Sequence, residues 1–321
     1  MAQLQDEIKA LLHVPEASHL NLEKESFFIP QDSLYQLLNE DKVTQVIDEI
    51  DEIPWHLKET TTVWIMKNGR RILAILSFLQ LKRSYISKFM ERDVFDEHLP
   101  LNENSLQAIL PEPANSLFYD AQWQFSAPKL ARDGVHRVFH PNHRLPFTIN
   151  RWIDSGGFGD IYEIMIHPKH QNVPLLLSET DQSMVRKEFK PPRYKKHVAN
   201  SDIQDDKEGF SNELRNLNIL NELKHANIIQ LLTSYTHNGR HNLIFPFVQD
   251  GNLEKLFKGD RPLQFDSDEK FLIALCGLSS AIQEVHYYTL QRLKIDLLGC
   301  HHDLKTKNIL NHSMQEALVT I

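Results

Sequence analysis

The stretch GCHHDLKTKNIL, residues 299–310, places an acid, a base and an amide close together as Asp303, Lys305 and Asn308. A carboxylate can accept a proton, an ammonium group can neutralise an anion, and an amide oxygen can hold a cation. Residues of these types also cap ordinary turns. The stretch therefore needs support from other parts of the chain before it indicates a site.

A glycine-rich unit, IDSGGFGDIY at 153–162, is the second candidate for chemistry. Glycines allow a tight turn and let backbone N–H groups approach a polyphosphate, where a Cβ atom would collide. A plain β-turn accounts for the unit equally well when the unit is taken alone.

Two single charged residues could join such a site. In the strand-like run MVRKEF, alternation puts Lys187 on the face opposite Arg186. In FSNELRNLNILNEL, residues 210–223, Glu213 lies at the border of a broad apolar helix face. Each residue, taken singly, is explained most simply as an ordinary solvent-facing charge.

The order of these features along the chain adds weight to all of them. A glycine loop between strands, a strand lysine, a helix glutamate, the run FPFVQDGNL and HHDLKTKNIL follow one another in the order of the protein-kinase signature motifs. Residues 147–321 thus resemble a eukaryotic protein kinase domain of the Ser/Thr type, and LKHANIIQLL at 223–232 resembles the segment after its regulatory helix. The resemblance implies an α+β fold with a β-rich N-lobe and a partial helical C-lobe.

The resemblance also implies a site for ATP and Mg²⁺. Lys187 would hold the α- and β-phosphates, and Glu213 would orient it through an ion pair. The other residues implied at the nucleotide are Gly156, Phe158 and Gly159 over the phosphates, Ile153, Ile161 and Val185 around the adenine, Phe245 at the back of the pocket, and the hinge residues Pro246, Phe247 and Val248. Pro246 keeps the carbonyl that the adenine needs, and Val248 supplies an N–H.

In the opening stretch, Asp303 resembles the catalytic base and Lys305 the residue that neutralises the transferred phosphate. Asn308 resembles a magnesium ligand. A lysine two residues after the aspartate favours protein substrates over small alcohols. The implied function is ATP-dependent phosphoryl transfer to Ser or Thr hydroxyls of a protein of unknown identity.

Several residues depart from the family pattern. Asp154 stands where the first loop glycine is usual, Val185 replaces an alanine, and the segment around LSETDQ (177–182) is expected to be an exposed insertion. His302 replaces the arginine that normally receives an activation-loop phosphate, so control by such a phosphate is not expected. Kinases with HHDLK at this position resemble those of filamentous fungi.

The composition of the chain indicates which kinds of partner and which cellular location to expect. The chain has 41% hydrophobic residues and a net charge of -8, dispersed along the sequence. This favours small molecules or proteins as partners, rather than nucleic acid or a membrane surface. Cys276 and Cys300 are too few for a disulfide framework, and the N-terminus has no leader pattern. We expect an intracellular protein, cytoplasmic or nuclear.

Hydrophobic periodicity suggests how the chain positions these residues. Residues 1–110 are expected to form a mostly helical region of unknown role, in which ILAILSFL is a buried helix; 111–146 an irregular linker; and 147–321 the kinase domain. Within the last, FTINRWI, DIYEIMI, MVRKEF, NIIQLL and NLIFPFV are expected to be strands. FLIALCGLSSAIQEVH is apolar nearly all round, as a fully buried helix would be.

Three histidines in HRVFHPNH, His136, His140 and His143, suggest a metal site at first sight. Neither a cysteine nor a carboxylate completes a ligand set within the segment. We expect exposed loop histidines here and no metal.

Two other functions stay open at this stage. The chain could be a pseudokinase or regulatory protein that binds nucleotide or a partner without transferring phosphate. Alternatively, the N-terminal helices could be the working part, as a module that binds a protein partner. EALVTI, residues 316–321, resembles the strand before the Asp-Phe-Gly motif of kinases, so the sequence is expected to be a truncated form without transfer activity.

Overall fold

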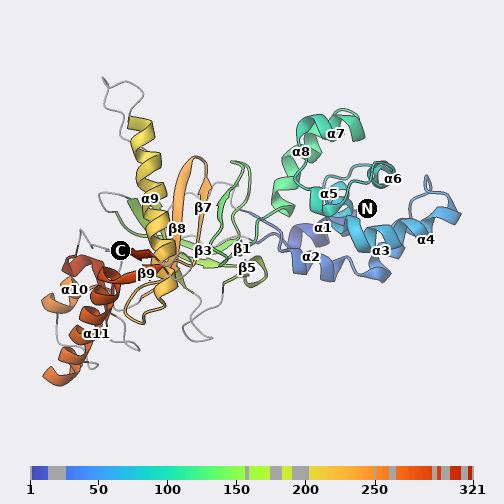
Figure 1. Cartoon of the computed structure of the whole chain (residues 1–321). Helices are drawn as coiled ribbons and strands as arrows, with labels where there is room; N and C mark the ends of the chain where they lie inside the picture. The colour runs from blue at the N-terminus through green and yellow to red at the C-terminus, as the bar shows by residue number, and fades with distance from the viewer. Residues whose placement is uncertain are drawn as a thin grey trace. The chain divides into compact units, whose positions relative to one another are not determined.

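The computed structural model describes residues 2–13, 27–155, 159–173, 183–189, 202–248, 251–259, 265–290, 295–297, 304–311 and 317–319. They form two compact units (Figure 1). The helical unit comprises Met1–Ala131, Phe139–Arg151 and Ile164–Leu176, and the sheet unit comprises Arg132–Val138, Trp152–Glu163 and Leu177–Ile321. Strands β3 and β4 contribute residues to both.

The helical unit confirms the helical periodicity before residue 110. Its helices are α1 (Ala2–Ala10), α2 (Gln31–Leu37), α3 (Glu40–Asp48), α4 (Trp55–Trp64), α5 (Arg70–Phe78), α6 (Ile86–Glu91), α7 (Glu103–Ile109) and α8 (Ala114–Phe125), with a π-turn, Ile65–Gly69, between α4 and α5. Residues 72–77 of α5 are all buried, so ILAILSFL is the buried helix that its composition predicts.

The start of α5 is capped by a side chain from a distant turn. Asp96, 7% exposed, accepts hydrogen bonds from the backbone N–H groups of Arg71 (2.9 Å) and Ile72 (3.0 Å). These donors have no carbonyl partner within the helix, so the carboxylate satisfies them. Burial raises the pKa of Asp96, although these hydrogen bonds and Arg71 lower it.

Helix α8 corrects the expectation of irregular structure after residue 110. Ala114, Phe118, Ala121 and Phe125 are buried, and their spacing of four, three and four residues is that of a helix face. Prolines at 111 and 113 precede the helix rather than interrupt it. The chain therefore continues its helical packing to residue 125.

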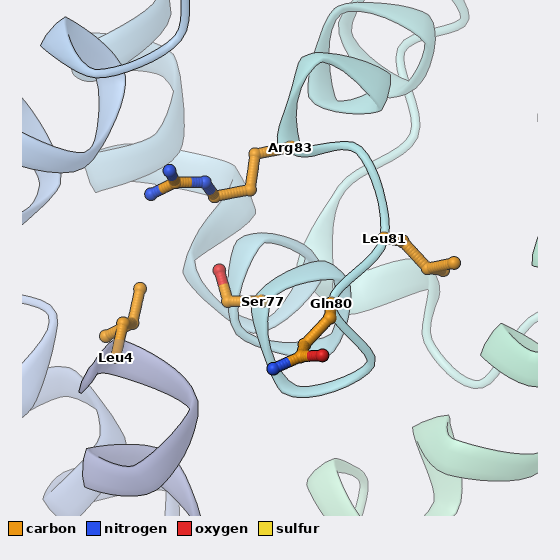
Figure 2. A pocket seen from close by; sticks show the side chains of 5 residues that line it. All are labelled: Leu4, Ser77, Gln80, Leu81 and Arg83. Atoms are coloured by element: carbon orange, nitrogen blue, oxygen red, sulfur yellow. The ribbon is translucent and has the colours of Figure 1, made fainter. Parts of the chain in front are cut away.

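One small pocket in the helical unit is lined by Leu4, Ser77, Gln80, Leu81 and Arg83 (Figure 2). Gln80 donates to Gln5 Oε1 at 2.7 Å, which joins the end of α5 to α1. The pocket includes none of the residues predicted at the nucleotide.

The second unit is built on a six-stranded sheet in the order β2-β7-β8-β6-β4-β3. Its strands are β2 (His136–Val138), β3 (Phe147–Ser155), β4 (Gly159–Ile166), β6 (Met184–Phe189), β7 (Thr233–His237) and β8 (Arg240–Pro246). The predicted strands FTINRWI, DIYEIMI and MVRKEF are therefore present. β6 and β7 are antiparallel to β8, whereas β2 lies parallel to β7.

Three helices follow the first strands of the sheet. The long helix α9 (Asp202–Leu223) lies alongside β7 and β8 in Figure 1, and the short α10 (Leu253–Lys258) and the long α11 (Asp268–His286) come after it. The short strands pair as β1 (Leu130–Ala131) with β5 (Gln171–Asn172), β9 (Tyr288–Leu290) with β10 (Ile295–Leu297), and β11 (Ile309–Asn311) with β12 (Ala317–Val319). β12 is the strand expected in EALVTI.

The run NIIQLL, expected to be a strand, is a buried loop before β7. Ile228, Ile229, Leu231 and Leu232 are all at most 5% exposed. The side-chain amide of Asn221 satisfies both the N–H and the C=O of Leu231, each at 2.8 Å. A side chain thus takes the place of a neighbouring strand at Leu231, and regular pairing begins only at Thr233.

Helix α11 is also less buried than its composition predicts. Ala274, Leu278 and Ala281 are buried along one stripe, whereas Leu272 and Ile273 are 59% and 46% exposed. In the described part of the chain, neighbouring segments cover only that stripe. Apolar composition therefore overestimated the burial of this helix.

No helix in the described ranges has both the length and the apolar character needed to cross a membrane.

Candidate functional site

An ion pair joins strand β6 to helix α9. Lys187 Nζ lies 2.7 Å from Glu213 Oε1, and the two side chains are 26% and 29% exposed. Lys187 reaches α9 because alternation places it on the face opposite Arg186, which is buried. The ion pair expected from the sequence is therefore confirmed.

Phe189 also contacts Lys187, although it was not among the residues predicted at the nucleotide. Lys187 Nζ lies 4.9 Å from the centroid of the Phe189 ring, within the range of a cation–π contact. Two residues along a strand share a face, so the alternation of MVRKEF already carried this signal.

The glycine turn approaches β6 closely. A Cβ atom on Gly159 would lie 2.5 Å from the carbonyl oxygen of Glu188, so only glycine fits where β4 begins. Across the turn, Ser155 Oγ donates to Asp160 Oδ1 at 2.7 Å. Gly156 and Phe158 lie outside the described residues.

Two residues predicted to cover the adenine lie on the strands beside this turn. Ile153, near the end of β3, is 40% exposed, and Ile161 of β4 is half-buried. Asp154, in place of the usual glycine, accepts a hydrogen bond from the Ser155 N–H at 2.8 Å. The apolar surface here is therefore accessible, with a carboxylate beside it.

The predicted hinge begins at Pro246, the last residue of β8. Val185 of β6 pairs with Phe245, and Met184 pairs with Pro246. Phe247 N–H then donates to the Ser183 carbonyl at 3.4 Å, which extends the pairing by one residue. Val185 and Phe245, both predicted at the nucleotide, are thus brought side by side.

The described end of the predicted catalytic stretch is held against the hinge. Leu310 and Phe245 pack against buried Val248 and Ile229 in one apolar cluster. Asn311 N–H donates to the Gly251 carbonyl at 2.8 Å. Contacts of both kinds, apolar and backbone, fix β11 beside the segment that follows β8.

Asn308 and Lys305 lie immediately before β11. Asn308 N–H donates to the Lys305 carbonyl at 2.8 Å, within a short 3₁₀ turn (Thr306–Asn308), and Lys305 is exposed. Lys307 reaches Glu254 of α10 at 3.6 Å. Asp303 and His302 lie outside the described residues, so the role of Asp303 stays a prediction.

The opposite face of the sheet is organised by a buried arginine. Arg186, 6% exposed, lies 4.1 Å from the Tyr162 ring centroid and donates to Glu188 Oε2 at 2.9 Å. Beside it, burial raises the pKa of Tyr235 to about 12, although the Arg186 guanidinium acts in the opposite direction. These contacts hold β4, β6 and β7 together from the side away from Lys187.

Of the three histidines of HRVFHPNH, His140 is an exposed loop residue as expected and His143 is a half-buried loop residue, whereas His136 lies in a strand. His136 is a half-buried strand residue in hydrogen-bond contact with Ser234 and Thr236. His140 stacks on Trp123 of α8, with ring centroids 4.5 Å apart. Their roles in pairing and stacking explain their presence in the segment. Across the residues that the structure describes, no group of three or more His, Cys, Asp or Glu could hold a metal ion.

Part of this chain is similar to known proteins. Residues 182–320 match the family model of the protein kinase domain. The chain is 24% identical over 219 residues to LRR receptor-like serine/threonine-protein kinase RGI5 of Arabidopsis thaliana, which covers 64% of this chain and 17% of that protein. It is 27% identical over 164 residues to L-type lectin-domain containing receptor kinase IX.2 of the same plant, with 51% and 20% covered.

The chain therefore spans about a fifth or less of the length of these curated relatives. A solved structure, PpkA-294 in its apo form, aligns with 55% of this chain and 58% of its own, at 19% identity and a TM-score of 0.39.

Residues 182–320 thus match the protein kinase domain, and the first of these distant relatives is by name a serine/threonine-protein kinase. The fold of this chain is kinase-like and mixed α+β, with a β-sheet N-lobe after a helical N-terminal region.

Proposed function

We propose that this chain binds ATP with Mg²⁺ and belongs to an enzyme that transfers the γ-phosphoryl group to Ser or Thr hydroxyls of a protein. The observation that carries the proposal is the Lys187–Glu213 ion pair, at 2.7 Å and within the segment that matches the kinase family. A lysine held by one carboxylate has donors left for phosphate oxygens. The site therefore fits a polyphosphate.

Each predicted residue has a defined task in this proposal. Lys187 binds the α- and β-phosphates, while Gly156, Phe158 and Gly159 cover them. Ile153, Ile161 and Val185 contact the adenine, Phe245 closes the back, and Pro246 and Val248 offer backbone hydrogen bonds.

The phosphoryl-transfer step uses the stretch before β11. Asp303 accepts the proton of the substrate hydroxyl and Lys305 offsets charge on the moving phosphoryl group. Asn308 supplies an oxygen ligand to Mg²⁺, which when bound neutralises the phosphate oxygens. The nearby backbone, fixed to Gly251 and Val248, keeps Asn308 in place.

A calorimetric titration of the chain with an ATP analogue and Mg²⁺ tests the binding step. Lys187→Met is expected to abolish measurable binding, because the phosphates lose their cation. Lys258→Met is the matched control: this lysine pairs with Glu254 but its side chain is 72% exposed, and binding should stay at the wild-type level. Equal affinity of wild type and Lys187→Met would refute the proposal.

The second candidate is a protein that binds nucleotide without transferring phosphate. Two carboxylates at the glycine turn, Asp154 and Asp160, motivate it, because their negative charge opposes the placement of the phosphates that transfer requires. Transfer of labelled phosphate by the full-length protein containing this chain separates the two functions. Transfer that Asp303→Asn abolishes supports the kinase, whereas tight binding with no transfer supports the second candidate.

A further inference from the structure

His241 lies against the helix that carries Glu213. Its ring stacks on that of Phe210, with centroids 3.9 Å apart and planes inclined by 4°. Phe210 is buried and comes three residues before Glu213 on α9, less than one helical turn away. The stack therefore ties strand β8 to the part of α9 that faces Lys187.

The aromatic contacts continue from Phe210 to the ammonium group itself. Phe210 meets Phe189 edge to face, at 5.3 Å and 78°, and Lys187 Nζ lies 4.9 Å from the Phe189 ring centroid. His241, Phe210 and Phe189 thus form a continuous series of rings. Both members of the ion pair lie beside this series: Lys187 contacts the Phe189 ring, and Glu213 follows Phe210 by three residues on α9.

A hydrogen bond to Thr236 of β7, which in turn contacts His136 of β2, holds the His241 ring. Its Nδ1 lies 2.8 Å from Thr236 Oγ1, and the same oxygen lies 2.9 Å from His136 Nε2. His136 Nδ1 in turn lies 3.0 Å from Ser234 Oγ. The network runs from β2 through β7 to β8, so the sheet edge determines where the ring stands.

We propose that His241 is a positioning residue of the nucleotide site: by stacking on Phe210, it sets α9 so that Glu213 meets Lys187. The proposal rests on the proposed function, since it concerns the same lysine. It also makes the site sensitive to protons. Thr236 has one hydroxyl hydrogen, which it can donate to one imidazole while accepting from the other. If both histidines are protonated, Thr236 can donate to neither and must accept from both.

Charge adds to this effect. The His136 and His241 rings lie 6.2 Å apart, so two imidazolium ions would repel each other. Burial lowers the pKa of His136, and the nearby His241 lowers it further. The neutral network is therefore complete at about pH 6.5, the ordinary pKa of histidine, and is lost only as the pH falls through the lowered pKa of His136.

Other charged groups face the network from each neighbouring element. Helix α9 contributes Arg215, whose positive charge opposes protonation of His136 and His241, and Glu222, whose negative charge favours it. β2 contributes Arg137, paired with Asp133; β7 contributes His237; and β8 contributes Arg240, paired with Glu188. The charges on β2 and β8 are paired, so the groups whose charge can change near neutrality are the three histidines His136, His237 and His241.

Two substitutions of His241 separate the effect of ring stacking from the effect of protonation. Binding of an ATP analogue with Mg²⁺ to the 1–321 chain is measured by calorimetry at pH 7.5 and 5.8. His241→Ala removes the ring and should weaken binding roughly two- to tenfold at pH 7.5, the range for one aromatic pair. His241→Phe keeps a flat ring without a proton site. It should bind like the wild type at pH 7.5 and lose less affinity at pH 5.8.

His225→Gln is the control for histidine titration elsewhere in the sheet unit. His225 bonds to Ser280 rather than to this network, so the variant should lose affinity at pH 5.8 as the wild type does. Protonation of the nucleotide itself is common to all variants and cancels in their ratios. Equal binding by His241→Ala and wild type at pH 7.5, or an equal pH response of His241→Phe, would overturn the proposal.

Hydrogen exchange without nucleotide keeps this test separate from that of the proposed function. Amides of residues 210–223 should exchange faster in His241→Ala than in the wild type or in His241→Phe. If the wild type binds no nucleotide, the proposed function fails, and this comparison alone decides whether His241 positions α9. Unchanged amide exchange of residues 210–223 in His241→Ala would refute the positioning role of His241.

Discussion

At the scale of single residues, Gly159 carries the tightest steric requirement of the candidate site. Replacing it with alanine puts a Cβ atom 2.5 Å from the Glu188 carbonyl oxygen, and because that oxygen is backbone, the strands must separate. We expect Gly159→Ala to lower the free energy of unfolding by about 1–3 kcal/mol, the usual cost of overpacking.

Urea denaturation followed by circular dichroism measures this loss. Gly259→Ala is the matched control, since its added Cβ would meet its nearest neighbour at an ordinary 3.4 Å. That variant should stay within about 0.5 kcal/mol of the wild type. Equal stability of the two variants would mean that β4 and β6 do not approach as described.

Arg186 is the residue whose removal should cost most on the other face of the sheet. Arg186→Met leaves Glu188, whose side chain is 13% exposed, with one of its two arginine partners. Breaking a buried ion pair typically costs about 3–5 kcal/mol, and the remaining Arg240 should reduce this towards the lower end. The midpoint of chemical denaturation reports the change.

Arg240→Met provides the comparison for Arg186. Arg240 binds the same carboxylate, but its side chain is 46% exposed, so its removal should cost less than about 1 kcal/mol. If the two substitutions destabilised the protein equally, the buried position of Arg186 would have no energetic meaning.

At the scale of elements, the segment before β5 is joined to the start of α2 by a neutral histidine. His170, 4% exposed, accepts a hydrogen bond from Gln31 N–H at 3.3 Å, and its other ring nitrogen lies 3.4 Å from the Pro128 carbonyl. Burial lowers the pKa of His170 and that of the adjacent His167. Protonation therefore favours the unfolded chain.

The helical unit should lose stability as the pH falls. The stabilisation from His170 is complete above about pH 6.5, where the unfolded chain is neutral too, and it decreases as the pH falls below that value. His170→Gln should cost about 1 kcal/mol at pH 7.5 and should flatten the decrease between pH 7.5 and 5.5. Urea midpoints across this range measure both effects, and an unchanged slope in the variant would contradict the assignment.

Most regular elements follow from local patterns in the sequence. Alternation predicts β3, β4 and β6, and helical spacing predicts the helices before residue 110 and residues 210–223 of α9, but not the start of that helix at Asp202. The Lys187–Glu213 pair is predicted by the resemblance to the kinase motifs rather than by local pattern, since each residue taken singly looks like a solvent-facing charge. The tasks of the residues around the nucleotide stay predictions.

The other features depend on contacts between distant parts of the chain. Leu231 looks like a strand residue, but the amide of Asn221 takes the place of a neighbouring strand. His241 looks like an ordinary surface histidine until the pairing of β7 with β8 places it over Phe210. Local composition contains no information about such partners.

At the scale of the whole molecule, the expected domain boundary at residue 147 does not coincide with the division into two compact units, because the helical unit contains residues on both sides of it. Residues 139–151 and 164–176 belong to the helical unit, although 147–151 and 164–166 are parts of strands β3 and β4. A fragment of residues 147–321 would separate these segments from the residues with which they form a unit. We expect it to melt at a lower temperature than the corresponding transition of the complete chain.

Differential scanning calorimetry of 1–146, 147–321 and the complete chain tests this division. Both fragments should be destabilised, since each lacks part of the helical unit. If 147–321 reproduced a transition of the complete chain at the same temperature, residue 147 would be a true domain boundary.

The parallel pairing of β2 with β7 also has a consequence for the order in which the fold forms. The contact of His136 with Ser234 joins residues 98 positions apart, whereas β7 and β8 are joined by the tight turn at Asn238 and Gly239. Closing a long loop is entropically more costly than closing a short one, so the β7–β8 hairpin should form early and β2 should join its edge late. Before β2 joins, His241 can already stack on Phe210, but Thr236 lacks its second imidazole partner. The proton-sensitive part of the network is therefore one of the last contacts that the folding chain makes.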